Sequence, residues 1–115
     1  MTVIQQAFKA GAEEAQRDIA AGKLRLQYNV AGEWGRDLKD KLLSRFGVEL
    51  IELTCFVTEE SNSFVAGYNA AVKAHVDGMF GQGAVDAIHQ DVQRRRKERY
   101  DDWVEANKNT AAQPE

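Results

Sequence analysis

The residues with the clearest chemical potential form a basic run near the C-terminus, Arg94-Arg95-Arg96-Lys97-Glu98-Arg99. Side chains of this kind could neutralise phosphates, and each phosphate contact would add to the salt dependence of binding. Consecutive residues of a helix point all round its axis, however, so the run does not make one basic face. Acidic residues also interleave at helical spacing, with Asp91 four residues before Arg95 and Glu98 four residues after Arg94. The pattern therefore favours a solvated helix over a nucleic-acid contact.

Two aromatic residues, Tyr100 and Trp103, follow this basic run directly. Arginine and aromatic side chains contribute most of the binding energy when they are buried in a protein interface. We therefore predict that the chain binds another protein, through a surface made of Arg94, Arg95, Arg96, Arg99, Tyr100 and Trp103. The alternative that uses the same segment is a nucleic-acid-associated regulator that contacts phosphates through Arg94–Arg99. It ranks below protein binding because of the interleaved acidic residues.

A second candidate site centres on Tyr68 and Asn69, which with Gly67 interrupt a run of strong helix formers. Together with His75 they could line a pocket between a helix and the sheet. This hypothesis makes the chain a small-ligand-binding protein or an enzyme. A tyrosine on the core side of the helix, with its hydroxyl hydrogen-bonded at the rim, is the simpler explanation.

No other motif indicates catalysis, so we predict no catalytic residue and no cofactor. The two histidines, His75 and His89, fall in different predicted helices, and the sequence has no HExxH, CxxC or clustered His/Asp spacing. We therefore predict no metal site. The lone cysteine, Cys55, lies in an apolar run and is predicted to be a small buried hydrophobic residue. His89 is predicted to be exposed.

Four helical and two strand patterns must position these residues. Apolar residues at helical spacing predict helices over about 3–21, over about 33–46, between Thr58 and Gly81, and over about 83–106. Lys23–Val30 alternates between apolar and polar residues, which predicts a half-buried strand. The apolar run Gly47–Val57 predicts the central strand, with both faces of its second half covered. Gly67 costs a helix interior about 1 kcal/mol relative to alanine, which predicts close packing against the sheet or the first helix.

The element order α-β-α-β-α-α predicts an α+β fold, or alternatively a small α/β fold, with a two-stranded sheet packed by helices. A strand, a helix and a second strand can form a parallel crossover. Residues 1–106 are predicted to form a single compact domain that includes the long charged C-terminal helix, and 107–115 a disordered tail. Two strands leave exposed edges, so we expect either a homodimer that continues the sheet or helices that close over both edges.

Composition limits the classes of function. The chain has 115 residues, of which 43% are hydrophobic and 29% charged, as in an ordinary soluble domain. Its formal net charge of −3 gives no general attraction to nucleic acid or to an anionic membrane. A single cysteine and the absence of a signal peptide or a spanning segment predict a cytoplasmic location and no membrane partner. We expect a non-catalytic regulatory protein, such as an inhibitor, an immunity-type protein or an assembly factor, that binds its partner through the last helix or a sheet edge.

Overall fold

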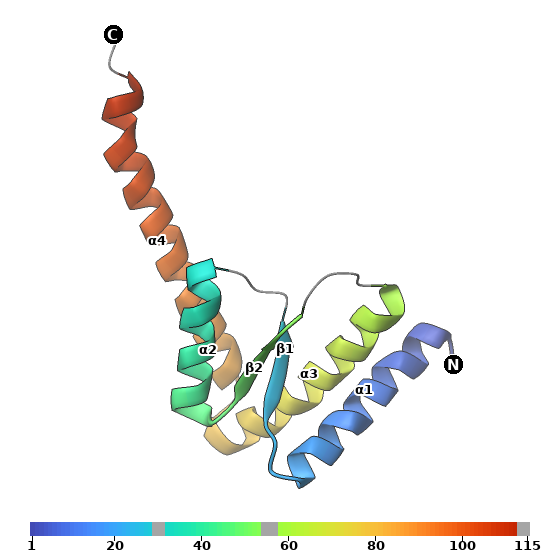
Figure 1. Ribbon diagram of the computed structural model, residues 1–115. Helices are drawn as coiled ribbons and strands as arrows, with labels where there is room; N and C mark the ends of the chain where they lie inside the picture. Colours follow the sequence, from blue (N-terminus) through green and yellow to red (C-terminus); the bar gives the residue numbers. More distant parts are fainter. Residues whose placement is uncertain (29–31, 54–57, 113–115) are drawn as a thin grey trace.

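The computed structural model describes residues 1–28, 32–53 and 58–112, and the elements follow the predicted order α-β-α-β-α-α (Figure 1). This order confirms the α+β class. The predicted central strand is only partly described, because Thr54, Cys55, Phe56 and Val57 lie outside the described residues. The elements are α1 Val3–Ala20, β1 Arg25–Tyr28, α2 Gly32–Phe46, β2 Glu49–Glu52, α3 Glu59–Phe80 and α4 Ala84–Ala112.

Strands β1 and β2 are parallel, and α2 makes the crossover between them. Leu26 lies opposite Leu50 in this register, and both side chains are buried. The alternate residues of β2 differ, since Glu49 is exposed and Ile51 only half-buried. In the described part of the sheet, helices therefore bury one face much more completely than the other. Within β1, Leu26 is buried as the predicted alternation requires, whereas Arg25, Gln27 and Tyr28 are all half-buried.

One apolar core joins the sheet to α2, α3 and the first half of α4. Its largest fully buried aliphatic side chains come from each of these elements, with the central tyrosine of α3 beside them. Burial of such side chains is the main favourable contribution to folding, at roughly 1.5–3 kcal/mol for each large residue. The members of the core are Ala15, Leu26, Leu38, Leu42, Val48, Leu50, Tyr68, Val72, Val76, Val85, Ile88 and Val92.

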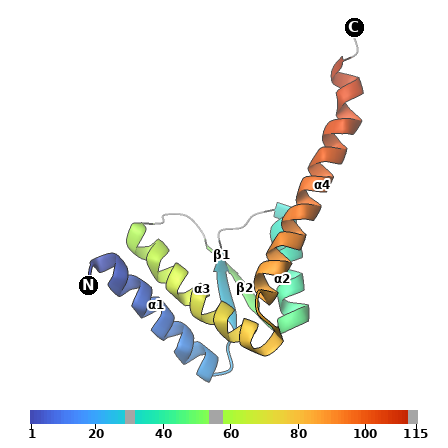
Figure 2. The same ribbon diagram turned by 180° about the vertical axis from the view of Figure 1, so that it is seen from behind.

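Helices α1 and α3 lie side by side at an unusually close distance (Figure 1, Figure 2). A Cβ atom added at Gly11 would lie 1.9 Å from the backbone oxygen of Phe64, and one added at Gly67 would lie 1.9 Å from that of Phe8. Only glycine leaves room for this approach. The Ser63 hydroxyl also donates to the Ile4 backbone oxygen at 2.7 Å across the same contact. The close packing predicted for Gly67 is confirmed, and the neighbour is α1.

Local sequence signals account for most helix boundaries. Thr2 and Gln5 form the predicted capping box at the start of α1, and Thr58 caps α3 through the backbone N–H of Ser61. Helix α4 is longer than predicted. It continues to Ala112, so 107–112 are helical instead of disordered. The alanines near this end favour the continuation, because alanine has the highest helix propensity.

Helix α4 extends well beyond the rest of the molecule (Figure 1, Figure 2). Its first turns pack into the core through Val85, Ile88 and Val92, whereas every residue from Gln93 to Lys108 is exposed. The radius of gyration is 18.0 Å, compared with about 13 Å for a compact domain of this length. The second half of α4 therefore projects into solvent.

Candidate protein-binding surface

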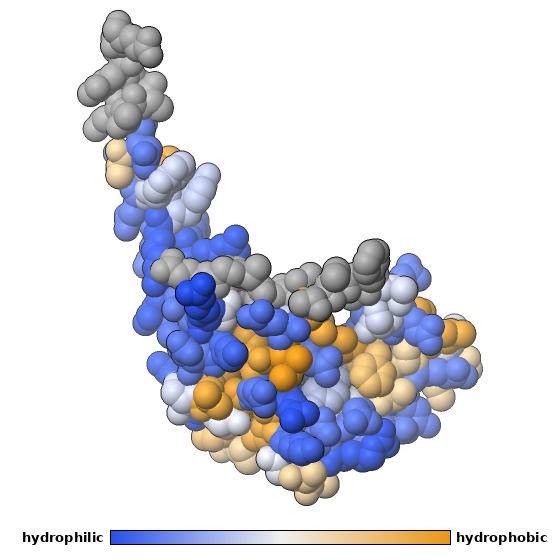
Figure 3. Space-filling view, viewed as in Figure 1, coloured by the Kyte–Doolittle hydropathy of each residue, from blue (hydrophilic) through white to orange (hydrophobic). Residues whose placement is uncertain are grey.

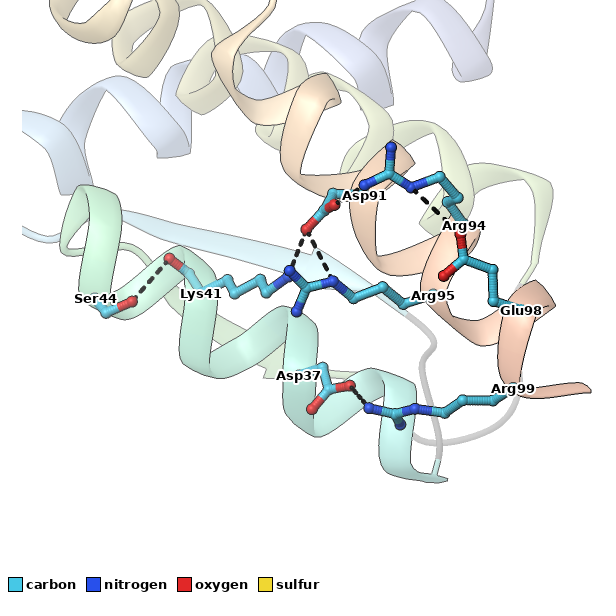
Figure 4. Close-up of polar contacts among 8 residues, drawn as sticks. All are labelled: Asp37, Lys41, Ser44, Asp91, Arg94, Arg95, Glu98 and Arg99. Carbon is cyan, nitrogen blue, oxygen red and sulfur yellow. Dashed lines mark hydrogen bonds and ion pairs between the residues drawn. The ribbon is translucent and has the colours of Figure 1, made fainter. Parts of the chain in front are cut away.

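The arginines of α4 form ion pairs with carboxylates of α4 itself and of α2. Arg95 pairs with Asp91 at 3.5 Å, and Arg99 pairs with Asp37 of α2 at 3.4 Å (Figure 4). Arg94 bonds to Asp91 at 2.7 Å and lies 4.0 Å from Glu98. The two pairs predicted at helical spacing, Asp91 with Arg95 and Arg94 with Glu98, are thus confirmed. Arg94, Arg95 and Arg99, which were predicted to bind a partner, each have a carboxylate partner within the chain.

Asp91 is the centre of the polar contact between α2 and α4. The Lys41 ammonium donates to its carboxylate at 2.5 Å, and these side chains are only 18% and 24% exposed. The hydrogen bond from Lys41, aided by the charges of Arg95 and Arg94, holds the pKa of Asp91 below its ordinary value. The carboxylate therefore stays ionised at neutral pH. The pairs of Asp91 with Lys41 and of Arg99 with Asp37 hold α4 against α2. Arg94 and Arg95 contact Asp91 from within α4.

Beyond the basic run lies a small aromatic surface, which we call the aromatic end of α4, made of Tyr100, Trp103 and Val104. Tyr100 is 63% exposed and Trp103 61% exposed. Their rings stack, with centroids 6.3 Å apart and planes 29° apart. Gln93, Arg96, Lys97 and Tyr100 line an open groove of about 370 Å³ alongside. Large apolar groups are thus held on a rigid helix, away from the core.

The surrounding surface makes this aromatic end distinct. Figure 3 shows the projecting part of α4 as mainly hydrophilic, whereas apolar surface gathers over the body of the domain. Tyr100 and Trp103 contribute little to folding, because more than half of the surface of each residue stays exposed. Two exposed aromatic side chains side by side make this end of α4 a candidate site of association.

The three residues predicted to line a pocket all lie on α3, but Tyr68 and Asn69 make their hydrogen bonds to different elements. The Tyr68 hydroxyl donates to the Asp18 carboxylate of α1, and Tyr68 is almost wholly buried. Burial and this hydrogen bond raise the pKa of Tyr68. His75 is half-buried and lies two turns further along α3. The structure therefore places Tyr68 in the core, as the simpler explanation predicted, with its hydroxyl tying α3 to α1.

Asn69 closes one edge of the sheet. Its Nδ2 donates to the Gln27 backbone oxygen at 2.7 Å, and its Oδ1 accepts from the Gln27 N–H at 2.8 Å. The backbone oxygens of Leu24 and Tyr28 accept from β2, so Gln27 faces the opposite edge of β1. The Asn69 amide thus takes the place of a third strand. Helix α3 therefore covers the β1 edge at Gln27, whereas the sequence predicted either a homodimer or helices over both edges.

His89 and Tyr28 make a contact that was not predicted from the sequence. His89 was predicted to be exposed, but it is half-buried, and its ring meets the edge of Tyr28 with centroids 4.7 Å apart. Burial, together with nearby Lys73, lowers the pKa of His89. Burial also raises the pKa of Tyr28 to about 12. Helical spacing contained the signal, since His89 is four residues after Val85 and three before Val92, both of which are buried.

Three further observations bear on the class of protein. Within the described residues, no three His, Cys, Asp or Glu side chains gather closely enough to hold a metal ion. None of the described helices is both long and apolar enough to cross a bilayer. The chain matches no protein-family model, no curated protein and no solved structure.

Proposed function

We propose that this chain is a non-catalytic protein that binds another protein chain through the aromatic end of α4. The observation that carries the proposal is the exposure of Tyr100 and Trp103, 63% and 61%, on a helix that projects from the domain. Tyrosine and tryptophan combine large apolar area with few rotatable bonds, so their burial at an interface is favourable. A rigid helix presents them with little loss of entropy on binding.

The ion pairs favour a protein partner over nucleic acid. Phosphate binding requires cations that are available to release counterions. Arg94, Arg95 and Arg99 are already paired with carboxylates of α2 or α4. The projecting half also carries Asp101, Asp102 and Glu105, which repel phosphate. The aromatic residues therefore supply the binding energy in this proposal, and the arginines position the helix.

A protein of this kind acts by occupying a surface of its partner, as an inhibitor, an immunity-type protein or an assembly factor does. Its single cysteine suits the reducing conditions of the cytoplasm, where we place its action. Nothing in this role requires a cofactor.

The experiment is affinity capture from a lysate of the source cells with the tagged full-length chain. The wild-type chain is compared with the double variant Tyr100→Ala/Trp103→Ala. Lys108→Ala is the matched control, because it changes an exposed residue of the same helix outside the aromatic end. We expect at least one protein, identified by mass spectrometry, to be retained by the wild-type chain and the control and lost from the double variant. Identical sets of retained proteins for all three chains would contradict the proposal.

A further inference from the structure

An open cleft lies at the end of the sheet where both strands begin. The turn between α1 and β1 and the turn between α2 and β2 both lie at this end (Figure 1). The cleft has a volume of about 450 Å³, which is within the range of small-ligand sites. We call it the cationic cleft, after the charged residues among its lining side chains Lys23, Arg25, Lys39, Leu43 and Glu49.

The charges of the cationic cleft do not balance. Three basic residues and one acidic residue give it a formal net charge of +2, in a chain whose formal net charge is −3. Arg25 Nε lies 3.6 Å from Glu49 Oε2, so this pair neutralises one charge of each sign. Lys23 and Lys39 are exposed and form no ion pair with any described residue. The positive charge of the cleft therefore comes from these two lysines.

Arg25 adds hydrogen-bond donors that the described chain leaves unsatisfied. It lies opposite Glu49 in the parallel register, on the face of the sheet that the core covers less. Their separation of 3.6 Å is too long for a hydrogen bond, and the buried Nε has no acceptor among the described residues. A guanidinium group is best satisfied by an acceptor with several oxygens, such as a carboxylate or a phosphate.

Leu43 gives the cationic cleft an apolar wall. It lies one turn after Lys39 on the same face of α2 and is 55% exposed. A ligand that covered this side chain would remove apolar surface from water, which is favourable. The cleft therefore suits a molecule that joins an anionic group to an apolar group.

We propose that the cationic cleft binds a small phosphate monoester with an apolar organic group. A phosphate monoester carries a charge of about −1.5 to −2 at pH 7, which matches the charges of Lys23 and Lys39. Its oxygens accept hydrogen bonds from these lysines and from Arg25, and its organic group covers Leu43. The cleft shares no residue with the aromatic end of α4, so this inference goes beyond the proposed function.

The test is a titration of the full-length chain with phenyl phosphate, up to roughly 20 mM, followed by two-dimensional amide NMR. The ionic strength is held constant, so that screening does not change during the titration. We expect saturable shifts of the amide signals of Lys23, Arg25 and Glu49. Inorganic phosphate should shift the same signals but bind more weakly, because it has no group to cover Leu43.

Two double variants with the same change in net charge separate the cleft from general attraction. Lys23→Gln/Lys39→Gln removes both lysine charges from the cleft, whereas Lys9→Gln/Lys108→Gln removes two from exposed positions outside it. We expect the first variant to bind phenyl phosphate at least about tenfold more weakly than the wild-type chain, since hydrogen bonds to charged groups are strong. The second variant should bind as the wild-type chain does. Leu43→Ser should weaken the binding of phenyl phosphate and leave that of inorganic phosphate unchanged.

Shifts that do not saturate would overturn the inference, as would equal binding of phenyl phosphate by the two double variants. Equal affinities of the wild-type chain for phenyl phosphate and inorganic phosphate would also overturn it, because Leu43 would then contribute nothing. The proposed function is independent of these results, since capture through Tyr100 and Trp103 uses a different surface.

Discussion

The contact between α1 and α3 supports a sharp prediction, because two glycines of the same helix have very different surroundings. Gly67 and Gly78 both lie within α3. A Cβ at Gly67 would lie 1.9 Å from the Phe8 backbone oxygen, whereas a Cβ at Gly78 would have no atom within 4 Å. Replacing either residue by alanine gains about 1 kcal/mol of helix propensity. Only Gly67→Ala must also push two helix backbones apart.

The magnitude follows from this difference. Overpacking a core typically costs about 1–3 kcal/mol, and the obstacle here is backbone that cannot rotate away. We therefore take the upper end of this range, about 3 kcal/mol, and expect Gly67→Ala to lower the free energy of unfolding by about 2 kcal/mol once the gain of about 1 kcal/mol in propensity is subtracted. At about 4 °C per kcal/mol, the Tm falls by about 8 °C. Gly78→Ala should raise the Tm by up to about 4 °C. Thermal unfolding followed by far-UV circular dichroism measures both, and equal stability of the two variants would refute the close approach of α1 and α3.

Two more predictions concern the sheet and its neighbours. Asn69→Ala removes both hydrogen bonds to the Gln27 backbone and should lower the free energy of unfolding in urea by about 2–3 kcal/mol. Asn69→Asp should be no more stable, since its carboxylate cannot donate a hydrogen bond to the Gln27 oxygen. An Asp variant as stable as the wild-type chain would count against the role of Asn69 at the sheet edge. The pKa of His89 is lowered by burial, so the unfolded state binds the proton more tightly and stability should fall as the pH drops below about 6.5. His89→Phe keeps an aromatic ring against Tyr28 and should lose this part of the pH dependence below about pH 6.5. Unfolding curves at several pH values would reveal or exclude this loss.

Much of the fold follows from local signals in the sequence. The effects of the capping residues Thr2 and Thr58 could be predicted, because each acts on residues nearby in the sequence. The effect of Gly67 could be predicted because it has no side chain. The bond from Asn69 to Gln27 could not, because it joins residues 42 positions apart and depends on where α3 crosses the sheet. The extension of α4 to Ala112 was missed because small, polar residues suggested disorder. Extending a helix that is already formed needs no new nucleation, so these residues can continue α4.

For the candidate surface too, local contacts could be predicted from the sequence and contacts between helices could not. Ion pairs within α4, such as Asp91 with Arg95, follow from helical spacing and were predicted. The pairs of Lys41 with Asp91 and Arg99 with Asp37 depend on which side of α2 faces α4, and this is decided by packing. Of the arginines in α4, these tertiary pairs include Arg99, whereas Arg94 and Arg95 pair with Asp91 within the helix. The aromatic residues are left as the main candidates for binding.

The central claim is that Tyr100 and Trp103 serve association and contribute nothing to the fold. Urea unfolding of Tyr100→Ala/Trp103→Ala beside the wild-type chain tests it most directly, at a protein concentration low enough that association adds no stability. We expect the two free energies of unfolding to agree within about 0.5 kcal/mol, as is usual for exposed sites. A loss of about 3 kcal/mol or more, typical of an aromatic residue removed from a core, would show that the pair belongs to the folded domain and would contradict the proposal.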